Sequence, residues 1–128
     1  MGSAQIATSA SGETPRVLVV DDYRDTAEVL VELLFNLGYD VRVARDGQEA
    51  LATAAEFSPH VALLDTSLPG MDGYEVARRI RRDASLCAMR LIALTGFGEN
   101  RDPRTAGFDD VVGKPVELSK VRELVSAS

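Results

Sequence analysis

Residues 60–73 read HVALLDTSLPGMDG, a short apolar run that ends in an acid and is followed by a turn. Residues 61–64 are all apolar, and the run is bounded by Pro59 before it and by a Pro-Gly pair after it. Such a run is too short for a helix and is typical of a strand buried on both faces. The strand ends at Asp65, where an acid often only stabilises the next turn. The role of Asp65 therefore depends on the side chains that other segments place beside it.

An earlier segment has the same layout. Residues 17–20 form a second unbroken apolar run, and it ends in the acid pair Asp21-Asp22. After this pair, apolar residues recur at helical spacing and predict a helix with Asp25 as its cap and Gly38 as its stop. The apolar positions of this helix are Ala27, Leu30, Leu34 and Leu37.

The next segments read as an exposed strand and two capped helices. Residues 39–43 alternate apolar and polar side chains, which is typical of a half-exposed strand at the edge of a sheet. Asp46 with Glu49 has the spacing of a capping box, and Asp72 with Glu75 repeats it. Each pair predicts the start of a helix.

The rest of the chain adds two strands and a last helix. Residues 91–94 are apolar and lead into Thr95, and residues 111–112 form a short strand that leads into Lys114. Residues 116–125 carry apolar side chains at spacings of three and four, as in an amphipathic helix. Strands that alternate with helices over about 110 residues predict an α/β fold with a parallel sheet covered on both faces. Right-handed crossovers then place every turn from strand to helix at one edge.

Five polar side chains stand at that predicted edge: Asp21 and Asp22 after the first strand, Asp65 after the third, Thr95 after the fourth and Lys114 after the fifth. Ligands bind outside the carboxyl ends of the strands in such sheets. Three carboxylates brought together repel one another and need a cation, and hard oxygen ligands favour Mg²⁺. With Mg²⁺ present, Asp65 is the best candidate for a nucleophile toward a phosphoryl group. Thr95 and Lys114 would share the charge on the transferring oxygens.

Length and composition limit the possible functions. At 128 residues the chain predicts a single domain, in which residues 1–15 are a flexible leader and residues 16–126 fold. A formal net charge of −6 argues against direct binding of nucleic acid, and the four arginines within residues 78–82 predict a solvated face. The single cysteine, Cys87, is expected to be a small core hydrophobe. Because the chain also lacks a secretory or membrane-spanning segment, we expect a cytoplasmic protein.

Together, these motifs resemble those of the response-regulator receiver domain of two-component signalling, the CheY-like family. The resemblance rests on Asp21-Asp22, Asp65 before LPGMDG, Thr95-Gly96 and Lys114-Pro115, in that order between Arg16 and Val125. It implies a flavodoxin-like fold, a single doubly wound five-stranded parallel sheet with strand order 2-1-3-4-5. It also implies a cis peptide bond between Lys114 and Pro115.

The resemblance also implies a function. Asp65 would accept a phosphoryl group from a histidine of a histidine kinase or a histidine phosphotransfer protein. Mg²⁺ would be bound by Asp21, Asp22, Asp65 and the backbone carbonyl of Ser67, while Thr95 and Lys114 would contact the phosphoryl group. The chain would be a signalling switch or phosphorelay intermediate that catalyses only its own phosphorylation and dephosphorylation.

The segment beyond Thr95 departs from the family pattern. Thr95 and Lys114 are 19 positions apart, which is shorter than the family's usual spacing by nearly one helical turn. Asp102-Pro103 can start a helix, but Gly107 would stop it. We therefore expect a single turn or an irregular, mobile loop over residues 98–106 in place of the fourth helix.

A second departure is Val111, which stands where receivers usually carry an aromatic ring. Together, the two departures affect the family's usual output face, which is built from the fourth helix, the fifth strand and the last helix. The hypothesis that follows is that Asp65 is phosphorylated but that the signal is read elsewhere, on the first helix.

Two other functions fit parts of the sequence. A Mg²⁺-dependent phosphohydrolase could use Asp65 but would want a second acid two residues later, where Ser67 stands. A receiver-like interaction module with a degraded output face would no longer be phosphorylated, but its acids would be the first residues lost, and all are present. The single histidine, His60, opens a buried strand and is expected to be structural, at the edge opposite the site.

Overall fold

The computed structural model describes residues 14–96 and 101–127, and it confirms the predicted α/β fold. Its strands are β1 (Arg16–Val20), β2 (Asp40–Ala44), β3 (Val61–Asp65), β4 (Arg90–Thr95) and β5 (Asp110–Gly113). They form one five-stranded sheet in the order β2-β1-β3-β4-β5, and all pairs of neighbouring strands are parallel. The predicted strand order is confirmed, as is the place of β2 at an edge.

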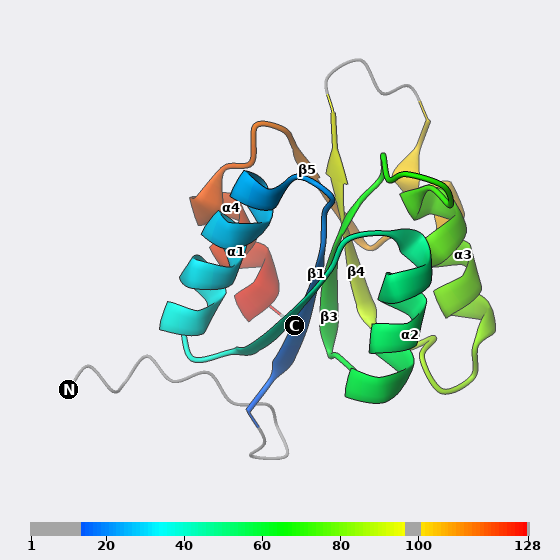
Figure 1. Ribbon diagram of the computed structural model, residues 1–128, viewed down its shortest axis with the longest axis horizontal. Coiled ribbons are helices and arrows are strands. Elements are labelled where there is room, and N and C mark those ends of the chain that lie inside the picture. The colour runs from blue at the N-terminus through cyan, green and yellow to red at the C-terminus, as the bar shows by residue number, and fades with distance from the viewer. Residues whose placement is uncertain (1–13, 97–100, 128) are drawn as a thin grey trace.

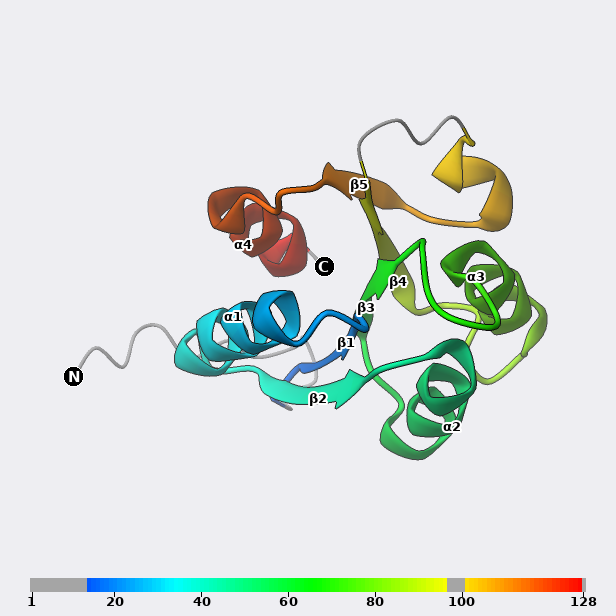
Figure 2. The same ribbon diagram turned by 45° about the horizontal axis from the view of Figure 1, so that its top comes forward.

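Helices cover both faces of the sheet. Figure 1 and Figure 2 show α1 (Arg24–Asn36) and α4 (Leu118–Ser126) on one face, and α2 (Gly47–Phe57) and α3 (Gly73–Arg82) on the other. The side chains of β1 alternate between two apolar clusters, Leu18 and Val20 toward α2 and α3, Val17 and Val19 toward α1 and α4. Within the described ranges, no helix is long and apolar enough to cross a membrane.

The two predicted helix starts, with Asp46 and Asp72 as caps, are confirmed. The backbone N–H of Glu49 donates to Asp46 Oδ1 at 2.8 Å, and that of Glu75 donates to Asp72 Oδ1 at 3.0 Å. These bonds satisfy backbone donors that would otherwise be free at the starts of α2 and α3.

The predicted cap of the first helix is wrong. The capping position of α1 is Tyr23, which makes no side-chain capping bond, and Asp25 lies inside the first turn. The chain turns earlier than expected because the backbone N–H of Tyr23 donates to Asp21 Oδ1 at 2.9 Å. The end of the helix was predicted better, since Gly38, with a φ of 97°, follows it closely.

The shortened fourth helix is confirmed. In its place lies η2 (Pro103–Ala106), a 3₁₀ turn in which Asp102 Oδ1 accepts from the backbone N–H of Arg104 at 3.1 Å. Gly107 then ends the turn in the left-handed conformation, at a φ of 104°. The predicted loop begins at residue 98, and residues 97–100 lie outside the part of the chain that the structure describes.

The arginines of α3 are only partly the solvated face that was expected. Arg79 is exposed and pairs with Glu75 at 2.9 Å. In contrast, Arg81 is half-buried and donates four hydrogen bonds at 2.6–2.8 Å. Its acceptors are the carbonyls of Gly107, Cys87 and Met89 and the carboxylate of Asp109. The side chain of Arg81 therefore ties α3 to the loops that lead into β4 and β5.

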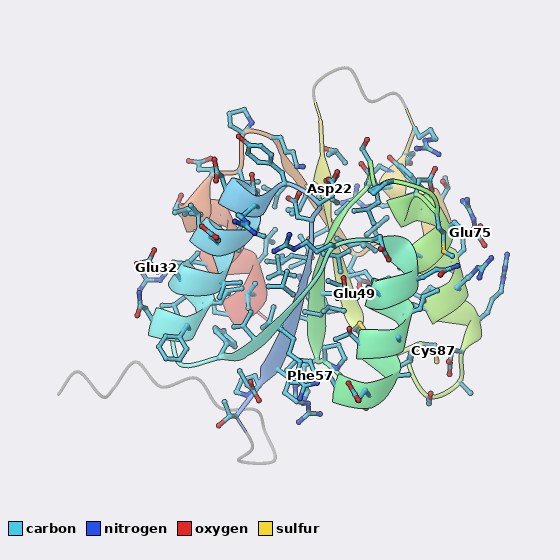
Figure 3. All side chains as sticks on the ribbon, viewed as in Figure 1. Asp22, Glu32, Glu49, Phe57, Glu75 and Cys87 are labelled. Carbon is cyan, nitrogen blue, oxygen red and sulfur yellow. The ribbon has the colours of Figure 1, made fainter. Side chains whose placement is uncertain are left out.

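The expectation that Cys87 is a core residue is wrong. Cys87 is exposed on the loop between α3 and β4 (Figure 3), whereas Leu86 and Met89 of the same loop are buried. Spacing alone did not reveal this, because the loop is a series of turns and has no helical or strand period.

Candidate metal centre

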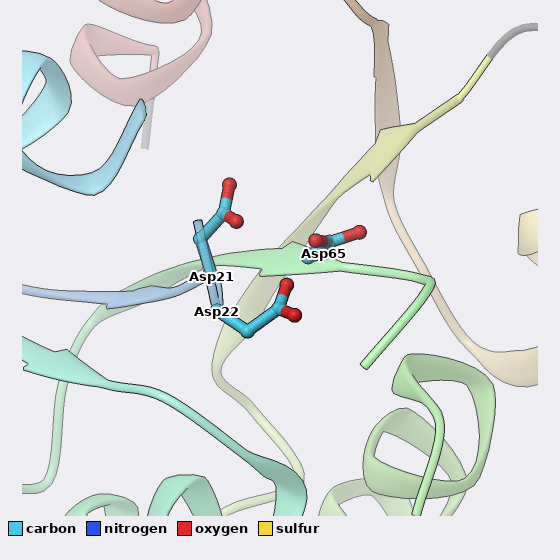
Figure 4. Close-up of side chains that lie close together, drawn as sticks. All are labelled: Asp21, Asp22 and Asp65. Atoms are coloured by element: carbon cyan, nitrogen blue, oxygen red, sulfur yellow. The ribbon is translucent and has the colours of Figure 1, made fainter. Parts of the chain in front are cut away.

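The parallel sheet places two of the predicted acids on neighbouring strands. Val20 pairs with Leu64 in the register between β1 and β3, so Asp21 and Asp65, one residue further along each strand, emerge at the same edge. Asp22 follows directly. One carboxylate oxygen from each of these three acids lies within 4.8 Å of the others, and Figure 4 shows the three side chains gathered at this edge.

The three acids differ in burial. Asp21 is 0% exposed and Asp65 is 3% exposed, whereas Asp22 is exposed. The predicted trio therefore has two acids inside the protein and one at the solvent side. A small ion and a second reactant can therefore reach the site from the side of Asp22.

Asp21 is held by one hydrogen bond, and its second carboxylate oxygen accepts none within the described part of the chain. Its Oδ1 accepts from the backbone N–H of Tyr23, but its buried Oδ2 has no hydrogen-bond partner among the described residues. Burial raises the pKa of Asp21, and the nearby charge of Asp65 adds to this, while the Tyr23 N–H and the Lys114 ammonium act in the opposite direction. A buried, unsatisfied carboxylate oxygen is a costly feature that a bound cation would relieve.

Lys114 reaches the acids from β5. Its Nζ donates to Asp65 Oδ2 at 3.0 Å and lies 3.5 Å from Asp21 Oδ2. Burial lowers the pKa of Lys114, but the hydrogen bond with Asp65 and the charges of both acids outweigh it and raise this pKa. Lys114 is therefore a cation in this site at any physiological pH.

Backbone contacts with β4 hold the segment around Lys114 in place. Its N–H donates to the carbonyl of Thr95 at 2.8 Å, and Gly113 pairs with Thr95 in the register between β4 and β5. The peptide bond between Lys114 and Pro115 is cis, as expected. Thr95 thus lies at the end of β4, next to the strand that carries Lys114.

Ser67 contributes a backbone contact at this edge. Its N–H donates to Asp65 Oδ1 at 2.9 Å, so both oxygens of Asp65 are held, one by Ser67 and one by Lys114. The predicted role of the Ser67 carbonyl as a metal ligand stays a prediction. The N–H donors of Ser67 and Tyr23 could not be identified from side-chain patterns, because every residue except proline offers such a donor.

The donor set fits a hard divalent cation. It consists of carboxylate oxygens only, two of them on buried acids that repel each other, with an open side toward solvent at Asp22. Mg²⁺ prefers one or two carboxylates, keeps several waters and leaves room for phosphate oxygens. The geometry therefore supports a Mg²⁺ site beside a lysine ammonium, an arrangement suited to binding and transferring a phosphoryl group.

His60 lies away from these residues. It precedes β3, its Nδ1 accepts from the backbone N–H of Arg16 at 3.0 Å, and its carbonyl accepts from that of Arg90. These bonds join the amino-terminal ends of three strands, which agrees with the structural role expected from the sequence.

Comparison with known proteins agrees with this geometry. Residues 17–126 match the family model described as the response regulator receiver domain. The chain is 40% identical over 111 residues to the DNA-binding response regulator MtrA of Mycolicibacterium smegmatis, a match that covers 87% of this chain and 47% of that protein. The chain thus spans about half the length of the curated relatives it matches.

The fold is also similar to that of solved response regulators and receiver domains. A response regulator from Chloroflexus aurantiacus superposes with a TM-score of 0.85 at 31% identity, covering 90% of this chain and 97% of the other. The receiver domain of Ssk1 from Saccharomyces cerevisiae, solved in complex with the histidine phosphotransfer protein Ypd1, superposes with a TM-score of 0.79 at 25% identity. That match covers 88% of this chain and 87% of the other.

Proposed function

The chain belongs to the response regulator receiver domain family, and from that premise we propose that Asp65 is the residue on which it accepts a phosphoryl group. Receiver domains are phosphoacceptor signalling switches. The observation that carries the proposal is the environment of Asp65, a nearly buried carboxylate 3.0 Å from the ammonium of Lys114 and beside two further acids.

We propose that Asp21, Asp22, Asp65 and the Ser67 carbonyl hold Mg²⁺ at this edge. When bound, the ion neutralises the repulsion among the acids and the charge on phosphoryl oxygens. Two observations support this ligand set, namely the buried Asp21 oxygen that accepts no hydrogen bond from the described residues and the mutual distances of the carboxylates.

The chemical step would be an in-line displacement on a phosphohistidine. A carboxylate oxygen of Asp65 forms the new O–P bond, the P–N bond to the imidazole breaks, and its electron pair stays on the imidazole nitrogen. The Lys114 ammonium, already beside Asp65, would turn to an oxygen of the transferred group. Thr95 would donate its hydroxyl to another. On this account the chain catalyses only its own phosphorylation and dephosphorylation.

The proposed phosphodonor is a histidine kinase or a histidine phosphotransfer protein. An open groove of about 530 Å³ lies between α1 and the β5–α4 loop, and Lys114 is one of its lining residues. Large apolar side chains that are exposed along it are Tyr23, Val29 and Leu118. Such a groove suits an apolar helix that presents a histidine to the site. The complex formed by the Ssk1 receiver with Ypd1 supports a donor of this class.

We also propose where the phosphorylated state is read out, where the domain begins and ends, and where the protein is located. The readout of the phosphorylated state on α1 is supported by the exposed Val29 and Phe35 and by the packing of Val111 against the core. The receiver boundaries at residues 16–126, the leader at 1–15 and a cytoplasmic location rest on the sequence. The net charge of −6 supports the absence of direct contact between this domain and nucleic acid.

A phosphohydrolase is a weaker account of the same site. The position two residues after Asp65 is Ser67, which supplies a backbone N–H to Asp65 and has no acid to activate water.

The first test is the Mg²⁺ dependence of phosphoryl uptake from acetyl phosphate. We expect the wild-type chain to be phosphorylated with Mg²⁺ and not with EDTA, because the three acids repel the anionic donor when no cation is bound. Asp22→Asn removes an exposed ligand, so we expect it to raise the Mg²⁺ concentration that gives half the maximal rate. Uptake at the same rate in EDTA would contradict the proposed metal site.

A further inference from the structure

The start of α3 lies against the backbone of the proposed phosphoacceptor. A Cβ atom built on Gly73 would lie 2.2 Å from the carbonyl oxygen of Asp65 and 2.7 Å from the Cα of Thr66. Contacts under 3.0 Å are essentially never seen for real Cβ atoms. The backbone of Gly73 therefore lies so close to that of Asp65 and Thr66 that only glycine, which has no Cβ atom, fits at this position.

The atoms on the far side of this contact cannot easily move away. They belong to the backbone of Asp65 and Thr66, and the N–H of Thr66 donates to the carbonyl of Leu94 in β4 at 3.1 Å. On the near side, the N–H of Gly73 donates to the carbonyl of Thr66 at 3.2 Å. The end of β3 is thus held between β4 and the first residue of α3.

The start of α3 is itself fixed by three contacts. Asp72 caps the helix through the N–H of Glu75, and its Oδ2 lies 3.2 Å from Arg101, which precedes η2. The guanidinium of Arg101 also lies over the ring of Tyr74, 3.7 Å from the ring centroid. The position of Gly73 is therefore set by contacts made outside the acid cluster.

We propose that Gly73 is a positioning residue for phosphoryl transfer to Asp65. The partners of the Asp65 carboxylate follow other strands, Asp21 directly after β1 and Lys114 directly after β5. A shift of the end of β3 therefore changes all of these distances together. A side chain at position 73 would require the backbones to separate by about 1 Å, and a misplacement of this size slows an oriented reaction strongly. This inference rests on the proposed function of Asp65.

The first experiment measures the position of the carboxylate without any metal or phosphodonor. The amide of Ser67 donates to Asp65 Oδ1, so its NMR chemical shifts report on that carboxylate. We expect Gly73→Ala to shift the Ser67 amide. Gly113→Ala should leave it in place, because a Cβ on Gly113 meets nothing within 4 Å. An unchanged Ser67 amide in Gly73→Ala would overturn the inference.

The second experiment separates positioning from stability. The rate of phosphorylation by acetyl phosphate is measured against Mg²⁺ concentration, at a temperature where each variant is folded. We expect Gly73→Ala to lower the maximal rate at saturating Mg²⁺ by about tenfold to a hundredfold. Gly107→Ala is the destabilised control, since Gly107 has a φ of 104° and its Cβ would meet Arg81, which lies at the opposite end of α3 from Gly73. Its maximal rate should stay within about twofold of wild type.

If Gly73→Ala does not fold, a matched pair of capping variants tests the positioning role of the start of α3 instead. Asp72→Ala and Asp46→Ala each remove the same capping bond, from α3 and α2 respectively. We expect Asp72→Ala to lower the maximal rate more than Asp46→Ala, because the first residue of α3, Gly73, abuts the backbone of Asp65. Equal rates for these two variants would overturn the inference, as would a Gly73→Ala rate equal to that of Gly107→Ala.

Failure of the proposed function can be distinguished from failure of this inference. A wild-type chain that takes no phosphoryl group would refute the proposed function, and the Ser67 amide signal without metal would still show whether Gly73 positions the Asp65 carboxylate.

Discussion

At the scale of single residues, the buried acid Asp21 lowers the stability of the fold and at the same time supplies a ligand for the proposed Mg²⁺ site. Asp21 is fully buried, carries an oxygen without a hydrogen bond and lies beside Asp65, so its charge opposes folding when no cation is bound. Lys114 compensates part of this charge from 3.5 Å. The acid is explained by the ion it is proposed to bind, because a structural role alone would be better served by a neutral side chain.

We therefore predict that Asp21→Asn stabilises the metal-free protein at neutral pH, by about 1 kcal/mol. The pKa of Asp21 is raised above 3.8 in the folded protein, so its ionisation lowers the free energy of unfolding as pH rises from 3.8 through the folded-state pKa. The advantage of the asparagine should accordingly shrink as the pH falls toward 3.8. Urea unfolding in EDTA measures both effects. Added Mg²⁺ should stabilise the wild type more than the variant, and a less stable Asp21→Asn protein in EDTA would contradict this account.

At the scale of elements, regular patterns were predictable and irregular ones were not. The strand order follows from the family resemblance. The starts of α2 and α3 follow from the local capping chemistry of Asp46 and Asp72, which spans only four residues. The cap of α1 was mispredicted because the first turn depends on the side chain of Asp21, which directly follows β1.

The role of Arg81 could not be predicted from the sequence. Its acceptors lie 6 to 28 residues away, and three of them are backbone carbonyls that any residue could offer. The side chains of the site were easier to find, since parallel strands bring their carboxyl ends to one edge regardless of such details. What the side-chain pattern omitted was the backbone part of the site, which includes the N–H groups of Tyr23 and Ser67.

We predict that Arg81→Met destabilises the fold by about 2–3 kcal/mol, because it leaves several acceptors around the missing guanidinium unsatisfied. Arg82→Met is the matched control, because Arg82 is the next residue of the same helix and is exposed. It should change the free energy of unfolding by less than about 0.5 kcal/mol. Chemical denaturation of both variants checks the prediction, which would be wrong if the two lost equal stability.

At the scale of the whole molecule, the two faces of the sheet carry different proposed functions, positioning of Asp65 on one and docking of the phosphodonor on the other. The face covered by α2 and α3 carries η2 and the contact of Gly73 with the end of β3. The face covered by α1 and α4 carries the groove that opens beside Lys114. The proposed docking surface and the proposed positioning contact therefore approach Asp65 from different sides.

This separation predicts that docking and chemistry can be altered independently. Val29 is 47% exposed and lines the groove, whereas Phe35 is 72% exposed further along α1 and lies outside it. With a phosphorylated histidine phosphotransfer protein as the donor, we expect Val29→Asp to slow transfer by about tenfold, because a charge replaces an apolar contact. Phe35→Asp should not slow it. Both variants should react with acetyl phosphate at the wild-type rate, and equal effects of the two substitutions on transfer from the phosphotransfer protein would contradict the proposed docking surface.

The central claim, that Asp65 is the phosphoacceptor, is tested most directly by the intact mass of the protein after incubation with acetyl phosphate and Mg²⁺. We predict that the wild type gains the mass of one phosphoryl group and that Asp65→Asn, which keeps the size of the side chain but not its nucleophilic carboxylate, gains none. A wild type that gains no mass, or a phosphoryl adduct that persists in Asp65→Asn, would contradict the claim.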